Sequence, residues 1–507
     1  MIAASTVLGQ VERVPVPHID WLAVSPLLVL VGGAVLLLTA HALTVRPPAD
    51  GTYAMFTVVT ALVALLAGVA VWERVTDPER GPYTAVAAAI TVDPFTAFFT
   101  VLICVAVVLT ALQADDYLRR EDLDGPEVYA LLLLSASGGV IMAAANDLIV
   151  LFLGLEVLSI AAYVMAGSHL RRIESQESAM KYFILGSFSS AFLLYGVALV
   201  YGATGSTNLG RIATFLAGNV LESRALLLGG FALLLVGLAF KVAAVPFHVW
   251  TPDVYQGAPT PITGFMASAV KAAGFAGIVR VFAVTFQDFR VDWQPVVWAL
   301  AVLTMVVGAV LAIVQDDVKR MLAYSSVSHA GFVLVGVYPA SDEGIAAALF
   351  YLLAYTFMVI GSFGVVTVVG RRGDRRHSLD DYRGLARARP ALAFAFTVFL
   401  LAQAGVPLTT GFLAKFFVIG AAVEDRAYAL AVIAMLAAVV AAYLYLRIIV
   451  AMYMSGEDAE ESAPRLRVPV GLGASLVAAV AFTIVFGVLP SAMVDFARDA
   501  VPVLFAL

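Results

Sequence analysis

Long apolar runs recur along this 507-residue chain, and they constrain its fold more than any other feature. Each run is about 20 residues long, so an α-helix built from it would cross the roughly 30 Å of hydrocarbon in a bilayer. Backbone inside a bilayer must satisfy its own hydrogen bonds, and single runs of this length do so as helices. We count about fourteen runs, near residues 21–44, 52–72, 93–113, 127–145, 147–168, 177–203, 225–254, 261–286, 293–314, 319–338, 344–370, 390–422, 427–454 and 468–490.

The composition agrees with a membrane protein and excludes a large soluble domain. Hydrophobic residues make up 62% of the chain and charged residues 13%, and no long polar stretch is present. The first 18 residues lack a basic start followed by a cleavage site, so the first helix is expected to be an uncleaved span. The sequence therefore predicts an all-α polytopic membrane protein with about fourteen transmembrane helices.

The distribution of basic residues predicts the orientation in the membrane. Alternate loops are rich in arginine, and such loops face the cytoplasm. These loops contain Arg46, Arg119, Arg120, Arg171, Arg172, Lys319, Arg320, Arg465, Arg467 and an arginine cluster in loop 371–389. An even number of spans then places both termini on the outer face. We interpret loop 371–389 as a solvated positive-inside loop in preference to a contact with a partner or with lipid headgroups.

Two spans carry a similar interruption, which suggests an internal repeat. One reads AAVPFHVWTPD around Pro246, and the other reads AGVPLTTGFLAK around Pro407. Asn146-Asp147-Leu148 and Gln315-Asp316-Asp317-Val318 form a second pair of similar segments. Together they predict a five-helix unit used twice, and an odd number of helices inverts the second copy, as in many transporters. The alternative is that proline is simply common in membrane helices.

The predicted organisation is one transmembrane domain, 1–507, with four parts. Three helices occupy residues 1–113. The first five-helix repeat covers 127–286, the second covers 293–454, and a last helix covers 468–490.

The lysines are few and unevenly placed. Of the 30 basic residues only five are lysines. Four of the five lie inside apolar runs: Lys181, Lys241, Lys271 and Lys415. Lys319 is assigned to the end of a loop. Arginine effectively never loses its proton in a protein, whereas a buried lysine can. The pattern therefore predicts that the lysines inside the membrane carry protons.

One carboxylate, Glu156, is predicted to lie deep within a span. An ionisable group in mid-membrane costs roughly 2.5–3.5 kcal/mol on insertion scales, so its presence needs a partner, water or a function. The alternative to proton transfer is a structural ion pair between Glu156 and Lys241. For Lys181, near the start of its helix, the alternative is a side chain that reaches the membrane interface.

Two histidines are candidates for a proton relay. His329 follows the hydroxyl-rich segment Tyr324-Ser325-Ser326-Val327-Ser328 inside a span. A neutral imidazole can accept a proton on one nitrogen and release one from the other. The alternative is a hydrogen-bonded core histidine. His248, just after Pro246, is the weaker candidate.

Sequence motifs for cofactors are missing. The chain has no Walker loop, no GxGxxG between a strand and a helix, and no cysteine cluster. The single cysteine, Cys104, cannot form an internal disulfide or hold an iron–sulfur cluster. We therefore expect no cofactor, metal or nucleic acid to bind this chain. The sequence therefore predicts a transport protein whose energy is supplied by a reaction outside this chain.

Two segments resemble a known family. FKVAAVPFHVWTPDVYQGAPTPITGFMASAVKAAG (240–274) and QDDVKRMLAYSSVSHAGF (315–332) are similar to the proton-translocating subunits of respiratory complex I and the related Mrp cation/proton antiporters. Within that family the chain most resembles the N-type subunits. It has lysine rather than glutamate in the second interrupted helix, a suitable length, and no long lateral helix after the last span.

The resemblance implies a role for each candidate residue. Glu156 and Lys241 correspond to the family's carboxylate–lysine pair, Lys271 to its central lysine, and Lys415 to its terminal lysine near the exit. His329 lies on the central axis, and Lys181 is a further candidate. These residues would move protons from the cytoplasm outwards across a bacterial plasma membrane, driven by redox chemistry in partner subunits.

The resemblance also implies partners. They are other membrane-arm subunits, including another antiporter-like subunit and small membrane subunits, together with the lipid bilayer. Two other functions remain open, namely a subunit of an Mrp-type sodium/proton antiporter and a purely structural spacer in a larger complex.

Overall fold

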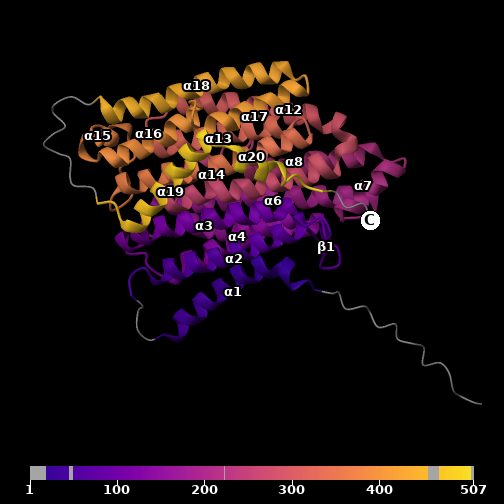
Figure 1. The fold of residues 1–507 in the computed structure, drawn as a ribbon, viewed down its shortest axis with the longest axis horizontal. Helices are drawn as coiled ribbons and strands as arrows, with labels where there is room; N and C mark the ends of the chain where they lie inside the picture. The colour runs from indigo at the N-terminus through magenta and orange to yellow at the C-terminus, as the bar shows by residue number, and fades with distance from the viewer. Residues whose placement is uncertain (1–18, 45–48, 222, 455–466, 504–507) are drawn as a thin grey trace, which may run out of the picture.

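The described residues of the computed structural model form a bundle of helices that lie side by side (Figure 1). They are residues 19–44, 49–221, 223–454 and 467–503, so the predicted loop residues Arg46 and Arg465 and the amino-terminal segment lie outside them. Helix α1 (Trp21–Leu43) lies at one edge of the bundle and α18 (Tyr428–Tyr453) at the opposite edge. The other long uninterrupted helices are α2 (Thr52–Thr76), α3 (Pro94–Arg120), α4 (Pro126–Ala144), α5 (Leu148–Ala166), α6 (Ile173–Thr204), α12 (Arg290–Ile313), α13 (Val318–Val337), α14 (Asp342–Gly370) and α19 (Val470–Val488).

The chain is a multi-pass membrane protein. Within the described residues, twelve helices are long and apolar enough to cross a membrane. Helix α13 is not one of the twelve, because its charged amino-terminal turn and hydroxyl-rich centre lower its hydropathy. The interrupted pair α16 (Pro390–Ala404) and α17 (Thr410–Glu424) is also absent, because each part is too short on its own. Adding α13 and this pair gives about the fourteen spans that the sequence predicts.

The two interruptions that the sequence predicts are present in the structure. The run 225–254 divides into α8 (Arg224–Val242) and α9 (Thr251–Gly257), with Pro246 between them. The run 390–422 divides into α16 and α17, with Pro407 between them. Each first half ends in a left-handed residue, Ala243 with φ 61° and Gly405 with φ 92°. A left-handed residue ends a helix by turning the chain away from its axis, and the missing proline N–H prevents the helix from resuming there.

The span from Thr260 to Thr285 changes its winding around Lys271. It passes through α10 (Thr260–Phe265), the π-helix η1 (Met266–Val270), α11 (Lys271–Ile278) and the π-helix η2 (Val279–Thr285). A π turn shifts the side chains that follow it to a different face of the helix, and such turns often occur at functional sites. All residues of this span except Val284 are buried in the bundle.

Several short elements were not predicted, because each is far shorter than a membrane span. Strands β1 (Tyr83–Ala85) and β2 (Ile90–Val92) form an antiparallel hairpin. The hairpin and α7 (Leu209–Gly218) lie at one end of the bundle, and α15 (Leu385–Ala388) lies at the other (Figure 1). The remaining short elements are the 3-10 turns η3 (Gln287–Phe289) and η4 (Leu379–Tyr382) and the helix α20 (Ser491–Arg498).

A repeated hydrogen-bond pattern relates the two halves of the bundle. Asp147 precedes α5 and forms an antiparallel bridge with Asn208, whereas Asp317 precedes α13 and forms the same bridge with Ser378. In each aspartate the side chain caps the helix that follows it. Five spans separate the two links, so they lie at opposite ends of the bundle. The fold is therefore an antiporter-like pair of inverted five-helix repeats, as the sequence predicts.

Candidate functional site

Lys241 lies in the last turn of α8, next to the first helix break, and is almost completely buried. Its Nζ donates to Ser159 Oγ on α5 at 2.7 Å and to Tyr182 Oη on α6 at 3.3 Å. The rings of Tyr163 and Tyr182 also lie within 5.6 Å of Nζ. Hydroxyls and aromatic faces therefore replace the water that a lysine would have outside the membrane.

The direct ion pair between Glu156 and Lys241, which was the structural alternative to proton transfer, is not formed in the structure. Across the described residues, no carboxylate oxygen lies within 4.0 Å of Lys241 Nζ. Glu156 lies one turn before Ser159 on α5, and its Oε1 is buried without a hydrogen-bond partner among the described residues. The hydroxyls of Ser159 and Tyr182 bind the ammonium in its place, and Glu156 makes no direct contact with it.

Lys271 begins the helix that follows the first π turn, and it is also buried. Its Nζ donates to the backbone oxygen of Ser326 at 2.6 Å and to Ser326 Oγ at 2.5 Å. Ser326 belongs to α13 and lies in the hydroxyl-rich segment that precedes His329. The central lysine and the predicted relay segment therefore meet in the middle of the bundle.

Each ring nitrogen of His329 lies within hydrogen-bond distance of a tyrosine hydroxyl. Nδ1 lies 2.6 Å from Tyr351 Oη, and Nε2 lies 3.0 Å from Tyr445 Oη. Tyr445 Oη in turn lies 2.6 Å from Ser325 Oγ, which donates to Gln403 Oε1 at 3.3 Å. A chain of hydrogen bonds thus runs from His329 to the end of α16.

Lys415 completes this chain from the other side of the second helix break. Its Nζ donates to the carbonyl oxygens of Gln403 and Ala404 at 2.8 and 2.9 Å, in the last turn of α16. The ring of Phe332 lies 5.0 Å from Nζ. Lys415 therefore binds the backbone of Gln403, the same residue whose side chain ends the hydrogen-bond chain from His329.

Lys181 and His248 lie outside this buried line. The Lys181 side chain is 40% exposed and pairs with Glu177 at 2.6 Å and Asp253 at 2.7 Å. His248 is partly buried, and its Nδ1 has no hydrogen-bond partner among the described residues. Its ring lies 6.5 Å from that of Tyr324.

A buried ion pair that the sequence did not predict lies at the amino-terminal end of α3. Asp93 caps α3 and forms a bidentate pair with Arg280, with both N–O distances at 2.7 Å. The Asp93 side chain is 0% exposed and that of Arg280 3%. Arg280 Nε also donates to the Ala143 carbonyl at 2.9 Å. Arg280, a charged residue inside the apolar run 261–286, was the sequence signal for this pair. The pair connects three helices and stabilises their packing.

Lys319 is not a loop residue, contrary to the sequence prediction. Its side chain is 0% exposed, and Nζ donates to the Ala258 carbonyl at 2.8 Å and to Asp374 Oδ2 at 3.4 Å. Its partner Asp374 belongs to loop 371–389 and is fully buried. The interpretation of this loop as solvated is therefore wrong at Asp374 and at His377, both of which the bundle encloses. Sequence alone gave no signal for the pairing, because 55 residues separate the partners.

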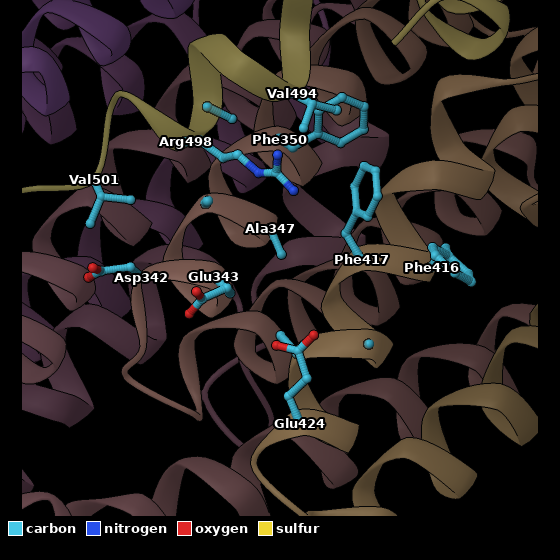
Figure 2. Close-up of a pocket in the computed structure, with 14 residues that line it drawn as sticks. Asp342, Glu343, Ala347, Phe350, Phe416, Phe417, Glu424, Val494, Arg498 and Val501 are labelled. Atoms are coloured by element: carbon cyan, nitrogen blue, oxygen red, sulfur yellow. The ribbon is translucent and has the colours of Figure 1, made fainter. Parts of the chain in front are cut away.

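A cavity of about 380 Å³ lies at the end of the bundle where α14 begins and α17 ends. Figure 2 shows Asp342, Glu343 and Glu424 around it, with Arg498 of α20 on the opposite side. Phe416 and Phe417, which follow Lys415 in α17, form part of its wall. Across the described residues, no group of three or more metal-ligating side chains is placed to hold an ion.

Comparisons with known proteins agree with this arrangement. Residues 145–441 match the family model described as NADH:quinone oxidoreductase/Mrp antiporter, TM. NADH-quinone oxidoreductase subunit N of Trichlorobacter lovleyi is 45% identical over 82% of this chain and 84% of its own length. Subunit N 1 of Sorangium cellulosum is 43% identical over 95% of this chain and 98% of its own length.

Solved structures have the same fold. A chain of respiratory complex I from Thermus thermophilus with bound aureothin has a TM-score of 0.78 and 33% identity, and the match covers 93% of this chain and 99% of that chain. A chain of the Mrp complex from a Dietzia species has a TM-score of 0.82. Its identity is 22% over 95% of this chain and 97% of that chain, so it supports the fold alone.

Proposed function

The chain belongs to the NADH:quinone oxidoreductase/Mrp antiporter family, and we propose that it is the N-type, proton-translocating membrane subunit of a bacterial NADH:quinone oxidoreductase. The observation that carries this proposal is the line of buried lysines and His329, each hydrogen-bonded inside the bundle. Relatives of 43–45% identity along most of the chain carry the subunit N name and support the same assignment.

The proposed path begins at Lys241. An opposite charge nearby stabilises a charged lysine, and loss of that charge favours release of the proton. When a neighbouring subunit draws Glu156 away, the proton of Lys241 passes to Lys271. Because Glu156 acts through its charge, a small movement of α5 changes this interaction without breaking a hydrogen bond.

The second part of the path leads from Lys271 through His329 to Lys415. The hydroxyls of Tyr351 and Tyr445 supply a donor or acceptor on each side of the imidazole, as a relay requires. Lys415 then releases the proton towards the acidic cavity of Figure 2, at the outer end of α17. Return of Glu156 resets Lys241 from the cytoplasmic side.

The setting of this subunit is part of the proposal. It lies in the bacterial plasma membrane with both termini on the outer face, and it contacts other membrane-arm subunits and lipid. The complex is the enzyme, a redox-driven translocase, and this chain carries out no redox chemistry and binds no cofactor of its own. The five-helix repeats 127–286 and 293–454 supply the two halves of the path.

The alternative is a subunit of an Mrp-type sodium/proton antiporter. It shares the fold and would share Glu156 and the lysines. Transport that requires sodium would favour it. The curated relatives of 40–50% identity carry the quinone oxidoreductase name and favour the first proposal.

Two substitutions of Lys241 test the proposal in inverted membrane vesicles that contain the whole complex. Lys241→Met removes the proton carrier, and Lys241→Arg keeps the charge but cannot release the proton. We expect both variants to lose NADH-driven proton uptake and quinone reduction, with NADH oxidation by an artificial electron acceptor retained as the measure of assembly. Full proton uptake by Lys241→Arg would contradict the scheme.

A further inference from the structure

The buried pair Lys319–Asp374 has no part in the path described above. Lys319 lies in the first turn of α13, and Asp374 lies in the loop that follows α14. Burying a lysine and a carboxylate is costly unless each has partners or a function. Lys319 Nζ lies 3.4 Å from the Asp374 carboxylate, which is long for an ion pair, and it donates a shorter hydrogen bond of 2.8 Å to the neutral Ala258 carbonyl. This is a poor arrangement for a purely structural ion pair.

Asp374, in contrast, is held from four elements besides its own loop. Its Oδ2 accepts from Arg172 at 2.9 Å and from Tyr117 Oη of α3 at 3.1 Å, and its Oδ1 accepts from Thr260 Oγ1 of α10 at 2.8 Å. Lys319 approaches from α13, and His377 Nε2 lies 3.0 Å from Oδ1 within the loop. Burial alone would raise the pKa of Asp374, but the charges of Lys319, His377 and Arg172 hold that pKa well below its usual value.

The turn that places Asp374 is strained. Arg371 has φ 53° and Asp374 has φ 47°, both in the left-handed region, and Gly373 between them has φ 88°. A side chain in this region costs free energy, and such residues tend to persist where the local geometry has a function. The backbone N–H of Gly373 is fastened to Glu121 Oε2 at 2.8 Å. The turn thus places Asp374 inside the bundle by means of an unfavourable local backbone conformation.

A polar cavity of about 270 Å³ lies against this turn. Asp374 and His377 form part of its wall, and Lys181, Asp253 and Glu177 form another part. Its polar lining and size leave room for several water molecules. Lys319 is not part of the lining, so Asp374 separates the cavity from Lys319.

Polar groups continue from Lys319 towards Lys271. Ala258, whose carbonyl binds Lys319, follows α9, and Tyr255 lies one turn earlier in α9. The Tyr255 hydroxyl is fully buried, has no hydrogen-bond partner among the described residues, and lies close to Ser326. Ser326 lies two turns after Lys319 in α13, about 10 Å along the helix, and binds Lys271.

We propose that Lys319 and Asp374 form a gate between this cavity and Lys271, through which protons from the cytoplasm are loaded onto the central lysine. The inference rests on the proposed function. Neutral Lys319 takes a proton from cavity water, and charged Lys319 passes one through Tyr255 and Ser326 to Lys271. Asp374 stays ionised as the fixed counter-charge, and displacement of its turn opens the way to the cavity.

The experiment uses the whole complex in inverted vesicles and compares four variants. Lys319→Arg keeps the charge and the hydrogen-bond donors but does not release a proton. We expect its NADH-driven proton uptake to fall about tenfold or more, as removal of a proton-transfer group commonly does, with artificial-acceptor activity retained. Arg320→Lys, at the next residue and paired with Asp253 at 2.7 Å, is the matched control and should pump normally. Proton uptake at the wild-type rate by Lys319→Arg would overturn the gate.

Lys319→His separates a proton-handling role from a structural one. Histidine loses its proton at lower pH than lysine, so a gate residue would move the alkaline limit of proton uptake to lower pH. A reduced rate with an unmoved pH profile would mean that Lys319 is structural, and would overturn the gate. Lys271→Met is measured in parallel. Normal proton uptake by that variant contradicts the proposed function itself, whereas its loss together with normal uptake by Lys319→Arg contradicts the gate alone.

Discussion

Lys241 and Lys415 lie beside the two helix breaks, yet they are bound by different kinds of group. Lys241 donates to the side-chain hydroxyls of Ser159 and Tyr182, with Glu156 one turn away from Ser159. Lys415 donates to two backbone carbonyls in the last turn of α16. Hydroxyls can donate as well as accept, and they can rotate, whereas carbonyls only accept. The first site can therefore pass a proton on through its own partners, and the second can only hold one until its geometry changes.

The same difference extends along the two repeats. Asp147 begins α5 and Asp317 begins α13 with the same bridge, so residues at equal distance from them correspond. By this relation Ser326 stands in the second repeat where Glu156 stands in the first. The second repeat thus has a hydroxyl where the first has a charge, and in the proposed mechanism only the first responds to an electrostatic signal from a neighbour. The inverted repeats share a fold and differ in what they do.

The strongest test of this contrast removes the charge from the first repeat. We expect Glu156→Gln to lower NADH-driven proton uptake about tenfold or more, because Lys241 then lacks the charge that modulates its proton. Glu127→Gln at the exposed start of α4 is the control, because its carboxylate lies outside both the buried line and the polar cavity. Normal uptake by Glu156→Gln would show that both repeats work without a carboxylate.

The second test disturbs the carbonyl site through its glycine. Gly405 has φ 92°, and a Cβ there would lie 3.1 Å from Lys415 Cδ. A side chain in the left-handed region costs about 1–2 kcal/mol, so Gly405→Ala should shift the end of α16 and lower proton uptake severalfold. Gly420→Ala in α17 is the control, because a Cβ there meets nothing within 4 Å. Equal uptake by the two variants would mean that Lys415 does not depend on the helix end.

The sequence predicts the spans well, because apolar length alone decides them, and it also locates both breaks through Pro246 and Pro407. It predicts that four residues lie inside the membrane, and the structure places them in the bundle interior. They are Lys241, Lys271, His329 and Lys415. Periodicity cannot show which partners a buried lysine finds. The hydroxyls of Tyr182, Tyr351 and Tyr445 lie on other helices, and their role depends on packing.

The errors have the same origin. Lys319 looks like a loop residue because Asp317 and Arg320 are its neighbours in sequence, yet it is buried by a carboxylate from a distant loop. For Lys181 the sequence left two alternatives open, and its contacts with two carboxylates at the surface favour the side chain that reaches the interface. Local composition indicates whether a segment is apolar, but contacts between distant segments decide whether a charged side chain is buried and which groups it binds.

A third test compares the hydroxyls of the two repeats. Ser159→Ala leaves Lys241 with only Tyr182 at 3.3 Å, whereas Ser326→Ala leaves Lys271 with the Ser326 carbonyl at 2.6 Å. A hydrogen bond to a charged group contributes about 1.5–3 kcal/mol, so both variants should pump more slowly. We expect the larger loss of proton uptake in Ser159→Ala, measured in the same vesicles. The reverse order would mean that the hydroxyl matters more in the second repeat.

The smallest effect is expected at Lys181. Its side chain is 40% exposed, and it makes ion pairs that contribute no more than about 1 kcal/mol when solvated. Lys181→Met leaves Asp253 paired with Arg320 at 2.7 Å, so the polar cavity keeps its charged wall. Proton uptake should therefore fall less than about twofold, in contrast to the loss expected for Lys241→Met on the same assay. A comparable loss in both variants would bring Lys181 itself into the proton path.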